Sequence, residues 1–180
     1  MKVVLDTCVI YPTVMREMLL GVARAGFYTP LWSGRILEEW ARAARKLGPG
    51  GEEIARGEVA LVRRDWPDAE VVWPGSLGNR LWLPDKADIH VLAAAIAGHA
   101  DVIVTLNAAD FPRNVLAEEG LQRKDPDSFL RDFWQADATS VAAVGNAVLA
   151  RACQLSGEEW DIRRLMKKAG LPRLGKALAG

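Results

Sequence analysis

Short apolar runs alternate with amphipathic segments in residues 1–124. The runs at residues 3–5 and 102–104 contain no polar position, which is typical of strands that are buried on both faces of a parallel sheet. The expected strands cover residues 2–6, 27–32, 69–73 and 101–107, and the expected helices cover residues 12–26, 34–48, 52–66 and 84–100. Strands that alternate with helices in this way predict an α/β fold with a parallel sheet.

Capping residues support several of these boundaries. Gly26 follows the first expected helix and is suited to end it, because glycine adopts the left-handed conformation found just after many helices. Ser33 precedes the second expected helix and is a good N-cap. The Gly-Pro-Gly-Gly cluster at residues 48–51 predicts a break before the third.

From Asp125 onward the pattern indicates helices only. Asp125 and Pro126 form an N-cap and first-turn pair, and an apolar stripe runs through residues 138–153. Ser156 and Glu159 have the spacing of a capping box that would open the next helix, and Gly170 would end that helix. We therefore expect two domains, at residues 1–124 and 125–180, the second being a helical extension.

The composition is that of a globular protein without a strong overall charge. Half of the residues are hydrophobic, and 23 basic residues balance 23 acidic ones, so no global positive field favours nucleic acid. Cys8 and Cys153 lack the spacing of metal ligands and suggest a reducing compartment. Asp6 interrupts the N-terminal apolar run, and no apolar stretch is long enough to span a bilayer. We expect a cytoplasmic protein with no membrane association.

Polar side chains end two of the expected strands. Asp6 ends the first expected strand, and Thr105 and Asn107 lie at the end of the strand expected at residues 101–107. Carboxylates are rarely buried without a partner, and ligands bind outside the carboxyl ends of parallel strands. These residues are therefore candidates for a site, although Asp6 could simply cap the next segment of the chain.

Asp88 is the second candidate acid. With Asp85 as the N-cap, Asp88 stands where an acid stabilises a helix N-terminus, but it also shares a stripe with the apolar residues Val91 and Leu92. We assign capping to Asp85 and a functional role to Asp88. His90 lies close by in sequence, and we expect it at the helix surface or the helix end, as we do His99.

Glu39 and Asp110 complete the set of candidates. Glu39 lies at the edge of an apolar helix face, where it either serves a site or pairs with Arg35, whereas Glu38 lies on the solvated side. Asp110 follows a strand in the segment NAADFP, where turn chemistry is the alternative.

These acids, in this order and on these elements, resemble the PIN-domain ribonucleases, particularly the VapC-type toxins. The resemblance rests on three segments, VVLDTCVIYP, WSGRILEEWARAARK and LPDKADIHVLAAAIAGHADVIVTLNAADFP, and more loosely on AGLPRLGKAL. It covers the chain from its first strand to the end of its last, about two-thirds of the whole, and the C-terminal helices match poorly. It implies a three-layer α/β/α sandwich around the parallel sheet and RNA cleavage that depends on Mg²⁺ or Mn²⁺.

Carried over by position, the resemblance implies Asp6, Glu39 and Asp88 as metal-binding acids and places Thr7 beside the first. The chain has Asn107 where many such proteins have a fourth acid, so either Asp110 supplies that carboxylate or the site has three acids. Thr105 and Asn107 would support the site. Arg16 is a candidate for holding phosphate, with a solvated helix face as the equal alternative.

The resemblance also implies partners. RNA would be the substrate, and a small cognate antitoxin would inhibit the enzyme. A homodimer is the remaining partner that the resemblance allows. A groove lined by Met15, Met18 and Trp40 could receive the antitoxin, unless these residues are ordinary core. The alternative function is a catalytically silent PIN-like module that binds RNA or protein, which Asn107 and the zero net charge favour.

Overall fold

The computed structural model describes all 180 residues and divides them into two compact units. The first unit contains Met1–Tyr11 and Thr29–Arg123, and the second contains Pro12–Tyr28 and Lys124–Gly180. One boundary therefore falls beside the predicted division at residue 124. The segment Pro12–Tyr28 belongs with the C-terminal helices, a grouping that sequence distance does not reveal.

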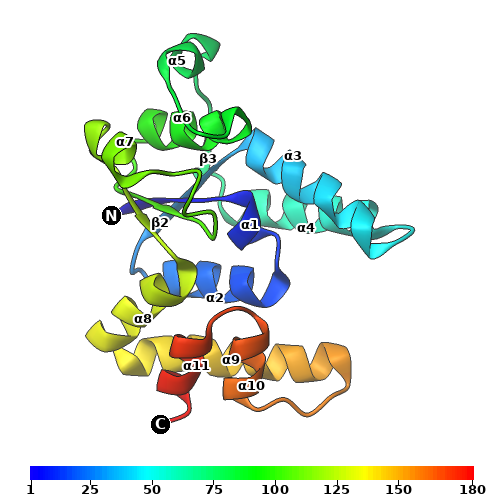
Figure 1. Cartoon of the computed structure of the whole chain (residues 1–180). Coiled ribbons are helices and arrows are strands. Elements are labelled where there is room, and N and C mark those ends of the chain that lie inside the picture. The colour runs from blue at the N-terminus through cyan, green and yellow to red at the C-terminus, as the bar shows by residue number, and fades with distance from the viewer. The chain divides into compact units, whose positions relative to one another are not determined.

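The first unit is built on a five-stranded parallel sheet with the order β3-β2-β1-β4-β5 (Figure 1). The strands are β1 (Lys2–Leu5), β2 (Thr29–Ser33), β3 (Glu70–Val71), β4 (Val102–Val104) and β5 (Gln122–Lys124). In the centre of the sheet, Val4 is in register with Leu31 on one side and Ile103 on the other. Helices lie on both sides of the sheet, so the predicted α/β/α fold class is confirmed.

The helical elements of the first unit connect these strands. They are α1 (Thr7–Ile10), α3 (Gly34–Ala43), η1 (Ala44–Leu47), α4 (Gly51–Asp65), α5 (Gly75–Arg80), η2 (Lys86–Asp88), α6 (Ile89–Ala97) and α7 (Arg113–Glu118). Ser33 caps α3 as predicted, because its hydroxyl accepts a hydrogen bond from the Ile36 amide at 3.3 Å. The helix expected at residues 84–100 is divided into the single 3₁₀ turn η2 and the helix α6.

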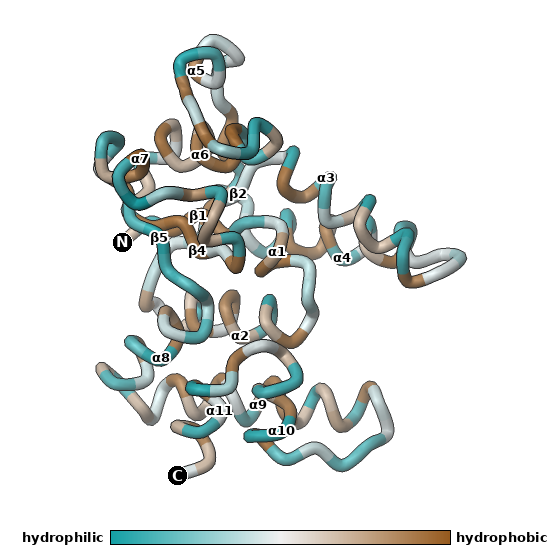
Figure 2. Tube along the Cα trace, viewed as in Figure 1, coloured by the Kyte–Doolittle hydropathy of each residue, from teal (hydrophilic) through white to brown (hydrophobic).

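The core follows the apolar runs. Val3, Val4 and Leu5 of β1 are fully buried, as expected for a central strand that is covered on both faces. Helix α6 is apolar almost all round and packs on β1, β2 and β4. Figure 2 shows β1, β4 and much of α6 toward the brown, hydrophobic end of its scale.

Four short elements were not predicted: α1, α5, α7 and β5. Helix α5 has the sequence GSLGNR, whose two glycines and single large apolar residue carry no helical pattern. Strand β5 has the polar sequence QRK and lies at the edge of the sheet.

The second unit is helical. It contains α2 (Thr13–Arg24), α8 (Pro126–Ala136), α9 (Ala138–Ser156), α10 (Ile162–Lys168) and α11 (Pro172–Leu178). Helix α9 packs against α2, α8 and α10. Asp125 caps α8 as predicted, and Gly26 has a positive φ of 92° just after α2, which fits its expected role as a stop. None of the helices in the chain is both long and apolar enough to cross a membrane.

The predicted capping box at Ser156 and Glu159 is wrong. Ser156 is the last residue of α9, where its hydroxyl donates to the carbonyl oxygen one turn earlier at 2.8 Å. Gly157, with a φ of 69°, ends that helix. The N-cap of α10 is Asp161, whose side chain accepts from the backbone amide three residues later at 2.8 Å.

Met15, Met18 and Trp40 are buried core residues. Each is at most 2 % exposed, although Met15 contributes to the lining of a pocket of the second unit together with Trp160 and Leu165. Their burial therefore favours the alternative given above, that these residues belong to the hydrophobic core.

Candidate functional site

Asp6 stands at the carboxyl end of β1, where it is the N-cap of α1. Its carboxylate is only 5 % exposed but is well supplied with donors. Oδ1 accepts from the Thr7 amide at 2.6 Å, and Oδ2 accepts from the Thr105 hydroxyl at 2.7 Å and from the Cys8 thiol at 3.2 Å. A buried charge is tolerated here because donors from two neighbouring strand ends stabilise it.

The turn after β4 is tied to the same point. The Thr105 hydroxyl, besides donating to Asp6, accepts from the Asn107 amide at 2.9 Å. The Leu106 amide donates to the Cys8 sulfur at 3.3 Å. These bonds hold the ends of β1 and β4 together, while the Asn107 side chain is exposed.

Glu39 reaches this region from α3. Its Oε2 accepts from the Thr7 hydroxyl at 3.0 Å, and its Oε1 lies 3.1 Å from both Arg35 Nε and His90 Nε2. Burial acts to raise the pKa of Glu39, but the hydrogen bond and charge of His90, with the bonds from Arg35 and Thr7, leave the pKa below its usual value. Glu39 is therefore ionised at neutral pH.

Glu38 belongs to a different environment. It pairs with Arg42 at 2.7 Å and with Arg56 at 2.9 Å on the exposed side of α3. Hydrogen bonds from Arg56 and Arg42 lower its pKa to about 2. Of the two adjacent glutamates, only Glu39 has a hydrogen bond to the segment that carries Asp6.

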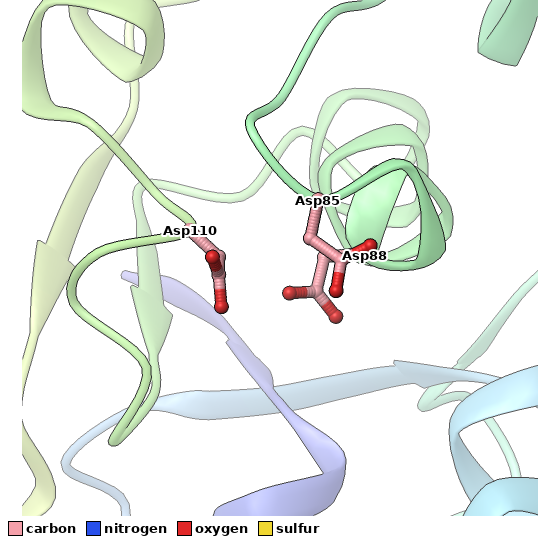
Figure 3. A group of neighbouring side chains, drawn as sticks. All are labelled: Asp85, Asp88 and Asp110. Carbon is pink, nitrogen blue, oxygen red and sulfur yellow. The ribbon is translucent and has the colours of Figure 1, made fainter.

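Asp85, Asp88 and Asp110 form an acidic cluster. Each offers a carboxylate oxygen that lies within 4.8 Å of the other two. Figure 3 shows Asp85 and Asp88 coming from the segment before α6 and Asp110 pointing toward them from the loop after β4. Asp85 caps η2 as expected, accepting from the Ala87 amide at 2.8 Å, but its place in this cluster was not predicted.

Asp88 is the most perturbed acid of the cluster. Burial raises its pKa to about 6, with further contributions from the negative charges of Asp6, Asp85 and Asp110. Its Oδ2 is buried and has no hydrogen-bond partner. Converging carboxylates with an unpartnered oxygen suit a hard divalent cation, which would bind oxygen ligands and offset the repulsion between the acids.

The structure thus connects most of the predicted site residues. Hydrogen bonds link Asp6, Thr7, Thr105 and Glu39, while Asp88 and Asp110 share the acidic cluster. The charge of Asp6 acts on Asp88, so the two groups lie within electrostatic reach.

Arg16 belongs to α2 in the second unit, where it is 3 % exposed. A side chain this buried presents little surface for binding a phosphate. The structure therefore gives no support to its predicted role in holding substrate.

His90 is the polar residue whose surroundings differ most from expectation. It lies in the first turn of α6, as a helix-end residue should, but it is only 2 % exposed and contacts Glu39. The signal that could have found it is the absence of a polar face on α6. A helix that is apolar all round is buried, so a polar residue within it needs a partner.

The family model described as PIN domain matches residues 2–109. The chain belongs to the PIN domain family. The matched residues run from β1 into the turn after β4, so they include Asp6, Glu39 and Asp88 and end one residue before Asp110. PIN domains are generally nucleases, and they usually use divalent metals. No curated protein and no solved structure matches the chain.

The chemistry available to this PIN domain is that of carboxylates rather than of a thiol. Burial, followed by the charge of Asp6, raises the pKa of Cys8 to about 12. A thiol with that pKa stays protonated at neutral pH and is a poor nucleophile. The acids, in contrast, provide oxygen ligands for a divalent cation that could act on a phosphodiester.

Proposed function

We propose that this PIN domain is an endoribonuclease that depends on Mg²⁺ or Mn²⁺. The observation that carries the proposal is the acidic cluster at the carboxyl end of the sheet, in which Asp88 has a pKa of about 6 and an unpartnered buried oxygen. Such crowding is unfavourable for a protein that binds no cation there and is relieved when one binds. The family membership supports hydrolysis of a nucleic acid.

The proposed roles combine the resemblance with the contacts. The resemblance implies Asp6, Asp88 and Glu39 as the metal-binding acids, and the carboxylates of Asp85 and Asp110 join Asp88 in the acidic cluster. When bound, the divalent cation would activate water and stabilise charge on the phosphate. The hydroxyls of Thr7 and Thr105 orient two of the acids by donating to Glu39 and Asp6, respectively.

The direct test is RNA cleavage by the purified protein. We expect it to cut single-stranded RNA with Mg²⁺ or Mn²⁺ and to stop when EDTA is added. Asp6→Asn should lower the rate by at least about 100-fold, because it removes a charge with little change in volume. Glu38→Gln is the matched control, since Glu38 pairs with surface arginines, and should leave the rate unchanged. An Asp6→Asn variant that cuts as fast as the parent contradicts the assigned role.

The alternative is a silent module that binds RNA without cutting it. The exposed Asn107, where many relatives of the VapC type would have an acid, and the net charge of zero support it. The two functions separate in one experiment: a gel shift with intact RNA in the presence of Mn²⁺ supports the silent module, whereas metal-dependent fragments support the nuclease.

The toxin role is the finer part of the proposal and rests on the resemblance to VapC-type proteins. Expression of the chain alone should slow growth of its host, and expression of Asp6→Asn at the same level should not. A small antitoxin protein co-expressed from a neighbouring gene should restore growth and co-purify with the chain. Normal growth during strong expression of the folded parent would rule out the toxin role without affecting the nuclease assay.

A further inference from the structure

His90 is a buried polar side chain to which the proposed cleavage assigns no role. Its Nε2 lies 3.1 Å from Glu39 Oε1, and its Nδ1 is buried without a hydrogen-bond partner. A carboxylate oxygen can only accept, so Nε2 carries the hydrogen of this bond. The bond to Glu39 is therefore made by Nε2 alone, while Nδ1 has no partner in its buried surroundings.

The bond between His90 and Glu39 joins the start of α6 to α3. His90 follows Asp88 by two residues, at the point where η2 passes into α6. Glu39 lies on α3, a separate element of the same unit. A hydrogen bond from the start of α6 to Glu39 therefore fixes the spacing between two acids of the proposed metal centre.

Glu39 has two other donors, Arg35 and Thr7, but neither links it to the start of α6 through a fully buried side chain. Arg35 lies one turn earlier on the same helix and also donates to the Ala87 carbonyl oxygen at 3.3 Å, but its side chain is exposed. Thr7 comes from α1 and holds the other carboxylate oxygen, Oε2. His90 is the donor with the least freedom to move, because its side chain is only 1 % exposed.

We propose that His90 is a positioning residue that holds the Glu39 carboxylate at a set distance from Asp88, so that both can bind one metal centre. It touches neither the metal nor the RNA and acts through Glu39. This inference rests on the proposed function, in that Glu39 and Asp88 are taken as metal-binding acids.

The test compares two amide substitutions that mimic different ring nitrogens. In His90→Gln the amide nitrogen takes the place of Nε2 and can still donate to Glu39. In His90→Asn it takes the place of Nδ1, which has no partner, and cannot reach Glu39. His90→Leu removes both nitrogens at similar volume. Mn²⁺ affinity is measured by titration calorimetry on the full chain, and melting temperature is measured in EDTA.

We expect His90→Gln to bind Mn²⁺ within about 3-fold of the parent, and His90→Asn and His90→Leu to bind it about 10- to 100-fold more weakly. Equal affinity for all three folded variants and the parent overturns the proposal. So does equal weakening of the Gln and Asn variants, which would show that ring shape rather than the donor matters. Should His90→Leu fail to fold, the Gln and Asn pair still decides the outcome.

Metal affinity is read without RNA, so the two proposals can fail separately. A parent that binds Mn²⁺ and shows the expected order of variants, but cuts no RNA, overturns the nuclease and leaves His90 as a positioning residue of a metal centre. A parent that cuts RNA, with variants of equal Mn²⁺ affinity, overturns the role of His90 alone. A parent that binds no Mn²⁺ overturns both.

Discussion

Replacing Asp88 by asparagine should stabilise the metal-free protein while removing its affinity for metal. In the absence of a cation, Asp88 is crowded by Asp6, Asp85 and Asp110, and its Oδ2 has no hydrogen-bond partner. The amide is neutral and has nearly the same shape, so Asp88→Asn resembles the parent with Asp88 protonated. The site is then expected to trade stability for function.

The size of the effect follows from the pKa of Asp88. A rise from 3.8 to about 6 would correspond to about 3 kcal/mol if the group were fully shielded from solvent. Asp88 is only partly buried, so screening reduces this to about 1 kcal/mol. In a protein of 180 residues, 1 kcal/mol raises the melting temperature by roughly 3 °C.

The sign of the pH dependence is set by the raised pKa. Between about pH 4 and 6 the folded parent takes up a proton at Asp88 that the unfolded chain does not, so this contribution to stability is present at low pH and is lost as the pH rises through about 6. The stability difference between Asp88→Asn and the parent should therefore be largest at pH 8 and small at pH 4.5.

Urea unfolding in EDTA at these two pH values is the assay. With excess Mn²⁺ at pH 8 the order should reverse, because a ligand at 100 times its Kd stabilises the parent by about 2.7 kcal/mol. A variant less stable than the parent at pH 8 in EDTA would refute the reasoning, as would a stability difference that does not change with pH.

Three further predictions concern single contacts. Asp127, 5 % exposed, accepts two backbone hydrogen bonds at 2.9 Å from the start of α11, so Asp127→Ala should lower the free energy of unfolding by about 3 kcal/mol in urea titrations, and a loss below about 1 kcal/mol would contradict this. Thr105→Val removes the hydroxyl that donates to Asp6 at 2.7 Å; calorimetry should show roughly 10-fold weaker Mn²⁺ binding with an unchanged circular dichroism spectrum, and parent-like affinity would count against it. Cys8 has a pKa raised to about 12, so at pH 8 it should react with iodoacetamide at least about 100-fold more slowly in the folded protein than in urea. Mass spectrometry of its peptide measures both rates, and similar rates in the two states would contradict the prediction.

Local sequence patterns predict several residues of the candidate site. The position of Asp6 after a run of buried aliphatic residues and of Thr105 after another indicates two strand ends, and parallel strands bring such ends to one edge. Helical spacing places Glu38 on the solvated side of its helix but leaves the role of Glu39 open, and the structure places Glu38 among surface arginines. His90 could not be assigned in this way, because its partner is 51 positions away in sequence (90 − 39) on another helix.

The sequence by itself determined the α/β class, the central strands and most helix boundaries, because these depend on periodicity and capping within a few residues. Only the tertiary structure decided which acids meet. Asp85 satisfies a capping pattern and also faces Asp110, and the second of these facts depends on how the loop after β4 folds back toward η2. The grouping of Pro12–Tyr28 with the C-terminal helices is of the same kind. Long-range contacts of this sort are set by packing and charge among distant residues, which no local pattern in the chain records.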